Sequence, residues 1–238
     1  MKILFSDYDG TIKTFENTPT IIENINFRMN VNAINKFIKQ GNFFNITTGR
    51  TTESIIKETK KYGIDYNYLT SYDGRITIDK DNKIVFAKYL DKELLKELKK
   101  IVENIDLVKK YNFYNESNIN YETDNTVMLS LHMFNISETK KRLEELKQKY
   151  PRLEIKYEMF WGIAHAMIKW NKKEGAKELI NINGWDKQDV YSVGDGRNDI
   201  EILEEYNGHR ILISHPHILK IKNTTTSVHR LIKKLNSI

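Results

Sequence analysis

Short apolar runs recur along the chain, and each is followed by polar residues and then by apolar residues at helical spacing. The runs predict buried strands, and the spaced residues predict amphipathic helices. Strands and helices that alternate with short links favour right-handed parallel crossovers. The expected strands lie at residues 2–6, 43–47, 68–70, 189–193 and 211–213.

Helices are expected between these strands, and glycines such as Gly41 and Gly63 end two of them. The segment 12–27 is polar and contains Pro19, so we expect it to form a loop or a small hairpin over the end of the first strand. A last helix is expected at residues 228–235.

The middle of the chain follows a different order, with an expected hairpin around residues 79–82, a helix capped by Asp91 and further strands. This order predicts a smaller α+β unit inserted into an α/β core with a doubly wound, Rossmann-like parallel sheet. Its aromatic residues Phe160 and Trp161 are expected in its core. The predicted domains are residues 1–79, 80–169 and 170–238, the second being the insertion.

Composition narrows the possible chemistry. The 238 residues are 39% hydrophobic, which is enough to fill a core, and no stretch is long and apolar enough for a membrane helix. The absence of cysteine excludes disulfides, thiolate nucleophiles and zinc–thiolate sites. The net charge is +6, but the sequence has no arginine-rich cluster, so we expect neither a nucleic acid nor a membrane as partner. Since neither a membrane helix nor a signal peptide is evident, we expect a cytoplasmic protein.

Three of the predicted strands end in residues that can carry chemistry. The first ends in Asp7 and Asp9, one residue apart, the second in Thr48, and a late one in Asp195 and Asp199. Ligands bind at the carboxyl ends of the strands in doubly wound sheets, so these groups converge if the strands are neighbours. Pooled carboxylates without thiols predict a hard-cation site that suits Mg²⁺.

Such a site suits phosphoryl transfer. One aspartate can attack phosphorus while a second moves the proton. Thr48 offers a hydroxyl and Gly49 a backbone N–H beside a helix N-terminus, which suits a phosphate. Lys172 or Lys173 can add a positive charge where the inserted unit returns to the core.

The motifs and their order resemble those of the haloacid dehalogenase superfamily phosphatases. The stretch Asp7–Thr11 resembles the first motif, Thr48–Arg50 the second, and Gly194–Asp199 the fourth in its Gly-Asp-x-x-Asn-Asp form. The insertion is similar to the type IIB α/β cap of the Cof-like branch. The resemblance spans most of the chain and implies a HAD core with a cap domain.

The resemblance also implies roles for individual residues. Asp7 would be the nucleophile and Asp9 the acid and base, while Thr48 and a lysine would hold the phosphate. Spacing to Leu179 favours Lys172 over Lys173 for that lysine, although the family's usual Lys-Gly pair is absent. The Mg²⁺ ligands would be Asp7, Asp9 through its carbonyl, Asp195 and Asp199. The remaining expected contacts to phosphate or substrate are Gly10, Gly49, Arg50 and Asn198.

The expected function is therefore a Mg²⁺-dependent phosphatase that acts on a small phosphorylated metabolite, such as a sugar phosphate, through an aspartyl-phosphate. Two alternatives remain open: a phosphomutase on sugar phosphates, and a non-enzymatic binding or regulatory protein on the same scaffold. We expect a monomer or a small homo-oligomer.

Overall fold

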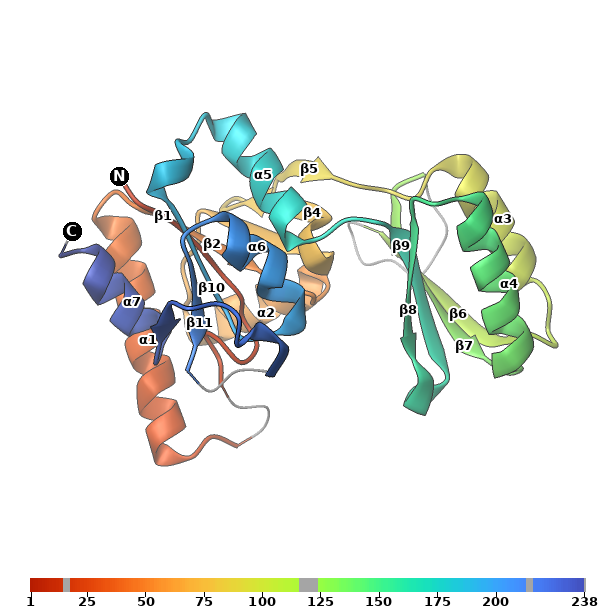
Figure 1. Cartoon of the computed structure of the whole chain (residues 1–238), viewed down its shortest axis with the longest axis horizontal. Helices are drawn as coiled ribbons and strands as arrows, with labels where there is room; N and C mark the ends of the chain where they lie inside the picture. The colour runs from red at the N-terminus through yellow and green to blue at the C-terminus, as the bar shows by residue number, and fades with distance from the viewer. Residues whose placement is uncertain (15–17, 116–123, 213–215, 238) are drawn as a thin grey trace. The chain divides into compact units, whose positions relative to one another are not determined.

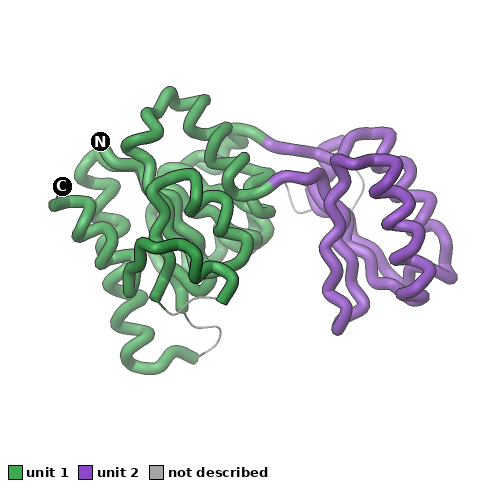
Figure 2. The backbone as a smooth tube through the Cα atoms, viewed as in Figure 1, with its two compact units in different colours: residues 1–86, 171–238 green, residues 87–170 purple. Residues whose placement is uncertain are grey.

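The computed structural model describes residues 1–14, 18–115, 124–212 and 216–237. It divides into two compact units, which we describe separately (Figure 2). Unit 1 comprises Met1–Phe86 and Asn171–Ile238, and unit 2 comprises Ala87–Trp170. The first boundary differs from the expected residue 80, because the strand β5 (Ile84–Ala87) adds to the sheet of unit 1.

Unit 1 is built on an eight-stranded sheet with the order β12-β11-β10-β1-β2-β3-β4-β5. The order reverses at β1, as in a doubly wound fold. Neighbouring strands from β12 to β3 are parallel, whereas β3 and β4 are antiparallel. The predicted α/β core is thereby confirmed. The strands are β1 (Ile3–Ser6), β2 (Phe43–Thr47), β3 (Tyr68–Ser71), β4 (Ile76–Asp79), β10 (Val190–Gly194), β11 (Gly208–Ile211) and β12 (Thr224–Thr225).

Helices cover both faces of this sheet. Ile3 and Phe5 of β1 pack against α5 (Lys172–Asn183) and α6 (Ile200–Glu205). The helices α1 (Ile21–Lys39) and α7 (Val228–Leu235) pack side by side, as Figure 1 shows. A ring contact between Phe27 and Tyr62 joins α1 to α2 (Thr52–Tyr62).

The expectation of a loop or hairpin over residues 12–27 is wrong for its second half, because α1 already begins at Ile21. Thr20 and Glu23 form a capping box, in which the Thr20 hydroxyl accepts from the Glu23 N–H. Ile21 and Ile22 are exposed, so the first turns lack the apolar face that marks an amphipathic helix. The strand expected at 211–213 is β11, which ends at Ile211, and residue 213 lies outside the described part of the chain.

Unit 2 is an antiparallel sheet of order β6-β7-β9-β8 with two helices packed on one face. The strand β6 had no predicted counterpart. The core of unit 2 is mostly aliphatic, with Leu94, Leu129 and Leu143 fully buried. The elements are α3 (Lys92–Val102), β6 (Val108–Asn115), β7 (Thr126–Met133), α4 (Ile136–Lys149), β8 (Leu153–Glu158) and β9 (Ile163–Ile168).

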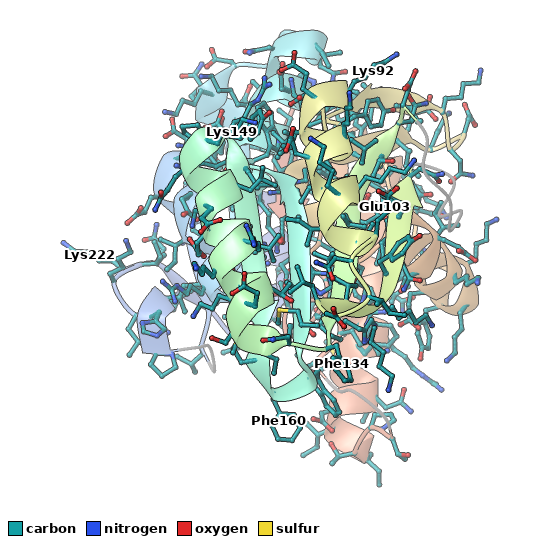
Figure 3. The ribbon with its side chains drawn as sticks, turned by 90° about the vertical axis from the view of Figure 1, so that its right-hand side faces the viewer. Lys92, Glu103, Phe134, Lys149, Phe160 and Lys222 are labelled. Carbon is teal, nitrogen blue, oxygen red and sulfur yellow. The ribbon has the colours of Figure 1, made fainter. Side chains whose placement is uncertain are left out.

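The expected burial of Phe160 and Trp161 is wrong. They lie in a short 3₁₀ turn between β8 and β9 and are 88% and 70% exposed. Phe160 lies at the same end of unit 2 as Phe134, away from Lys149 (Figure 3). Among the described residues, no helix has the length and apolar character needed to cross a membrane.

Candidate active site

Three carboxylates meet at the carboxyl ends of neighbouring parallel strands. Asp7 follows β1, and Asp195 and Asp199 follow β10, which pairs with β1. One carboxylate oxygen from each residue lies within 4.8 Å of the other two. Asp7 and Asp199 are buried and Asp195 is half-buried. The prediction that the separate acid motifs lie close together in the fold is confirmed.

The loop after β10 wraps around the carboxylate of Asp199. Oδ2 of Asp199 accepts hydrogen bonds from the backbone N–H groups of Asp195 and Gly196, at 3.1 and 2.9 Å. A Cβ at Gly194 would lie 2.4 Å from Cγ of Asp199, so only glycine fits there. The Gly-Asp-x-x-Asn-Asp motif thus positions its last aspartate through its own backbone.

The loop after β1 receives Asp195 in a similar way. The hydroxyl of Thr11 donates to Oδ1 of Asp195 at 2.8 Å. Gly10 has a left-handed backbone (φ 75°), and a Cβ at this position would lie 2.2 Å from Oδ2 of Asp195. Gly10 therefore allows the two acid-bearing loops to approach each other.

Lys172 lies inside the acid cluster. Its Nζ is 2.6 Å from Oδ1 of Asp7 and 2.7 Å from Oδ1 of Asp199, and its side chain is only 1% exposed. Lys173 is 32% exposed and pairs with Glu174 at 3.4 Å. Of the two candidate lysines, only Lys172 contacts the carboxylates.

A close backbone contact sets the position of Lys172. Asn171 caps α5 by accepting from the Glu174 N–H at 2.9 Å. Gly74, with φ 98°, lies against this first turn, and a Cβ there would be 2.2 Å from the Asn171 carbonyl oxygen. Gly175 faces Gly74 across the same contact, with its Cβ position 2.7 Å from the Gly74 oxygen. Gly175 supplies the close approach, although it is three residues after Lys172 rather than next to it.

Burial and charge oppose each other at Asp7 and Lys172. Burial raises the pKa of Asp7, Lys172 lowers it, and the neighbouring carboxylate of Asp199 raises it again. Burial alone lowers the pKa of Lys172, but Asp199, Asp7 and Asp73 outweigh it and raise that pKa above its ordinary value. The site therefore favours a positive charge beside the buried carboxylates.

The loop after β2 supplies the predicted hydroxyl and the cation beside Asp9. Thr48 is buried, with its hydroxyl accepting from the Arg50 N–H at 3.2 Å. Arg50 forms a bidentate ion pair with Asp9, with Nε and Nη2 at 2.6 and 2.7 Å from its two carboxylate oxygens. Gly49 precedes α2, whose N-cap is Thr51. These groups line one pocket of about 370 Å³ together with two of the three clustered carboxylates. The lining residues are Asp7, Asp9, Thr48, Gly49, Arg50, Asp195, Gly196 and Asn198.

Asp73 is a site residue whose place the sequence analysis did not predict. Its Oδ1 accepts a hydrogen bond from the Asn198 side chain at 3.0 Å and lies 3.1 Å from the Cβ position of Gly49. Its backbone is left-handed (φ 51°, ψ 46°), which is uncommon outside glycine. The Asp-Gly pair directly after a predicted strand was the available signal. Asn198 is thereby held by Asp73.

The three carboxylates suit a hard divalent cation. Asp7 and Asp195 lie close together, and burial raises the pKa of each. A divalent ion would offset the repulsion between such groups, and oxygen donors are those that Mg²⁺ prefers. Asp199 already accepts from Lys172 and two backbone N–H groups, so it suits an indirect contact through water.

Comparison with known proteins agrees with this geometry. A family model described as haloacid dehalogenase-like hydrolase matches residues 4–154 and 108–212. A phosphoglycolate phosphatase from Methanosarcina acetivorans is 25% identical over 203 residues, which is 85% of this chain and 79% of that protein. A phosphoglycolate phosphatase from Sulfolobus acidocaldarius is 45% identical over 55 residues, or 23% of this chain and 24% of its own length.

Solved structures show the same fold at lower identity. The HAD subclass IIB sugar phosphatase BT4131 matches with a TM-score of 0.69 and 17% identity, over all of this chain and 98% of that one. A haloacid dehalogenase-like hydrolase from B. subtilis matches with a TM-score of 0.72 and 15% identity over the whole of both chains. The family model covers well over half of the sequence, and the chain therefore belongs to the haloacid dehalogenase-like hydrolases, as its motifs predicted.

Proposed function

We propose that this hydrolase is a Mg²⁺-dependent phosphatase that acts on a small phosphorylated metabolite through an aspartyl-phosphate. The observation that carries the proposal is the buried carboxylate of Asp7, which shares Lys172 with Asp199 at the carboxyl end of the parallel sheet. The phosphatase names of relatives from Methanosarcina and Sulfolobus support the same reaction class.

In the first step, a carboxylate oxygen of Asp7 forms a bond to phosphorus as the bond from phosphorus to the leaving oxygen breaks. For this step one oxygen of Asp9 is released from Arg50 and protonated, and it gives its proton to the leaving oxygen. Lys172 and the hydroxyl of Thr48 hold the phosphoryl oxygens, and the N–H of Gly49 adds a donor at the start of α2.

In the second step, the Asp9 carboxylate takes a proton from water, and the oxygen of that water attacks phosphorus. The bond between phosphorus and the Asp7 oxygen breaks, which releases inorganic phosphate and restores both aspartates. Asp9 ends this step protonated, ready for the next cycle.

The proposed Mg²⁺ ligands are the carboxylates of Asp7 and Asp195 and the backbone carbonyl of Asp9, with Asp199 acting directly or through water. The cation would neutralise phosphate charge and so allow a carboxylate to approach phosphorus. Gly10, Thr11 and Lys172 keep the carboxylates in place around it.

We further propose that unit 2 is a cap that selects the leaving group. Its support is its place in the chain, since it is inserted between the two segments of unit 1 and ends at Trp170, two residues before Lys172. Relatives are named for phosphoglycolate and for sugar phosphates, so both belong in a substrate panel.

The test is hydrolysis of 4-nitrophenyl phosphate and of a panel of metabolite phosphates in Mg²⁺, followed by released phosphate. Asp7→Asn is expected to abolish turnover, because an amide cannot act as the nucleophile. Asp65→Asn, which changes an exposed aspartate in the same way, serves as the matched control and is expected to keep full activity. Turnover by the Asp7 variant at the wild-type rate would contradict the proposal.

A further inference from the structure

One carboxylate oxygen of α2 holds both ends of the loop that carries Asp9. Oε2 of Glu58 accepts from the Tyr8 hydroxyl at 2.9 Å and from Nζ of Lys13 at 2.8 Å. Tyr8 is fully buried, and the Lys13 side chain is only 8% exposed. None of these three side chains takes part in the reaction steps proposed above.

The loop between these two anchor points is closed on itself. The N–H groups of Ile12 and Lys13 both donate to the carbonyl oxygen of Tyr8, at 3.0 and 2.9 Å. The N–H of Gly10 donates to the carbonyl oxygen of Lys13 at 2.8 Å. A loop so closed moves as one piece, so the contacts at Tyr8 and Lys13 help to set the direction of Asp9.

The ring of Tyr8 also supports the partner of Asp9. The guanidinium carbon of Arg50 lies 5.3 Å from the centroid of this ring, within the range of a cation–π contact. Its planar fork then holds both oxygens of Asp9. A continuous set of contacts therefore runs from Glu58 through Tyr8 and Arg50 to the carboxylate of Asp9.

Glu58 is suited to this role because it is ionised. Burial raises its pKa, but the hydrogen bonds from Lys13 and Tyr8 and the charge of Lys13 outweigh burial, and the pKa of Glu58 falls below its ordinary value. The Tyr8 hydroxyl stays protonated, because burial and its bond to Glu58 raise its pKa. The carboxylate is therefore an acceptor for both partners.

We propose that Glu58 is a positioning residue that fixes Tyr8 and Lys13 and thereby aims the carboxylate of Asp9 at the leaving oxygen. The inference rests on the proposed function, in which Asp9 is the proton donor. Asp7 and Lys172 are held by other contacts, so loss of Glu58 leaves the nucleophile and the phosphate contacts in place.

The test uses the leaving group. An alkyl leaving group needs a proton as the bond to phosphorus breaks, whereas 4-nitrophenolate is stable enough to leave without one. Because kcat/KM reports the steps up to this bond cleavage, misplacing Asp9 lowers it selectively for the alkyl substrate. We expect Glu58→Ala to lower kcat/KM by roughly tenfold or more for the best alkyl phosphate of the panel. For 4-nitrophenyl phosphate the expected loss is below about threefold.

Two further variants separate positioning from a general loss of structure. Glu58→Gln keeps an oxygen acceptor at the same place but lacks the charge that pairs with Lys13, so it is expected to restore part of the alkyl activity. Glu53→Ala removes the same charge from an exposed site on the same helix, and we expect it to leave kcat/KM unchanged for both substrates. Equal losses on both substrates in Glu58→Ala, or no loss on the alkyl phosphate, would overturn the inference.

A stability cycle tests the same contacts without activity. Glu58→Ala and Tyr8→Phe remove the two ends of one hydrogen bond, so the double variant should be less destabilised than the sum of the single variants in urea. Strict additivity would overturn the link between Glu58 and Tyr8. A wild-type protein that hydrolyses neither phosphate would instead contradict the proposed function, and the cycle would still decide whether this contact exists.

Discussion

Nζ of Lys172 lies 2.6 Å from Oδ1 of Asp7, and both side chains are buried. The two residues are 165 positions apart in the sequence and come together because α5 begins where the Tyr72–Gly74 turn meets it. The buried cation and the buried carboxylate depend on each other, since each would be costly to bury without the other.

Replacing Lys172 by Met should therefore affect both activity and stability. Activity should fall by roughly a hundredfold or more, because the proposed donor to the phosphoryl group is lost. The free energy of unfolding, measured with urea in Mg²⁺-free buffer, should fall by about 3 kcal/mol, because Asp7 and Asp199 keep their burial but lose their cation. Lys173→Met is the matched control and should change either quantity little, since its side chain is 32% exposed. A larger loss of activity in Lys173→Met would assign the phosphate contact to Lys173 instead.

Gly10→Ala should abolish activity through Asp195. Gly10 and Gly41 both have left-handed backbones, with φ 75° and 82°, so an alanine at either position costs about 1 kcal/mol of strain. A Cβ at Gly41 meets no atom within 4 Å, whereas at Gly10 it falls 2.2 Å from Oδ2 of Asp195. Gly41→Ala should thus keep its activity and lose only stability in urea. Equal activity in the two variants would show that Asp195 can move without consequence.

Mg²⁺ should stabilise the native protein through the acid cluster. A cation present at a hundred times its dissociation constant adds about 2.7 kcal/mol to the free energy of unfolding, so the Tm should rise in Mg²⁺ and fall again with EDTA. Asp195→Asn should remove most of this shift, because it takes one carboxylate from the cluster. The exposed Asp65→Asn should keep the shift in full. A shift that persists in Asp195→Asn would place the cation elsewhere.

Much of the site was predictable because its residues come directly after the predicted strands in the sequence. Asp7, Thr48 and Asp195 each come right after a short apolar run, and the pairing of β1 with β2 and β10 brings those ends together. The order of motifs then identified the family. Lys172 was favoured over Lys173 by spacing along one helix, and the cap at Asn171 fixes that spacing.

The remaining contacts join residues that are far apart in the sequence, so no local pattern predicts them. Glu58 lies 50 residues after Tyr8 and reads as one charge on the polar face of an amphipathic helix. Asp73 was not among the expected site residues, and its contact with Asn198 spans 125 positions. The start of α1 was missed because Pro19 and the asparagines around it made the segment resemble a loop. Only packing of distant segments gives these residues their roles.

Acid should weaken the fold partly through His209. This residue of β11 is 6% exposed, and a ring nitrogen lies 2.9 Å from the carbonyl oxygen of Asn207. Burial lowers the pKa of His209 below its ordinary value of 6.5, although the Asn207 contact opposes this, and the nearby charge of Lys234 acts with burial. As the pH falls below about 6.5, the unfolded chain takes up this proton before the native protein does. The unfolded state then binds more protons, so the free energy of unfolding declines towards the lower pKa of the native state.

His209→Gln should remove this contribution while keeping a polar side chain in the same place. As the pH falls from 7.5 to 5, we expect the urea midpoint of the wild type to fall faster than that of the variant. Near pH 7.5 His209 is neutral in both the folded and the unfolded chain, so it should add no pH dependence there. His165 and His229 also have pKa values lowered by burial, so the wild-type slope contains their share and only the difference between the two proteins reports His209. Parallel curves over this range would mean that His209 takes up its proton equally in the folded and unfolded chains, and that its burial carries no cost in acid.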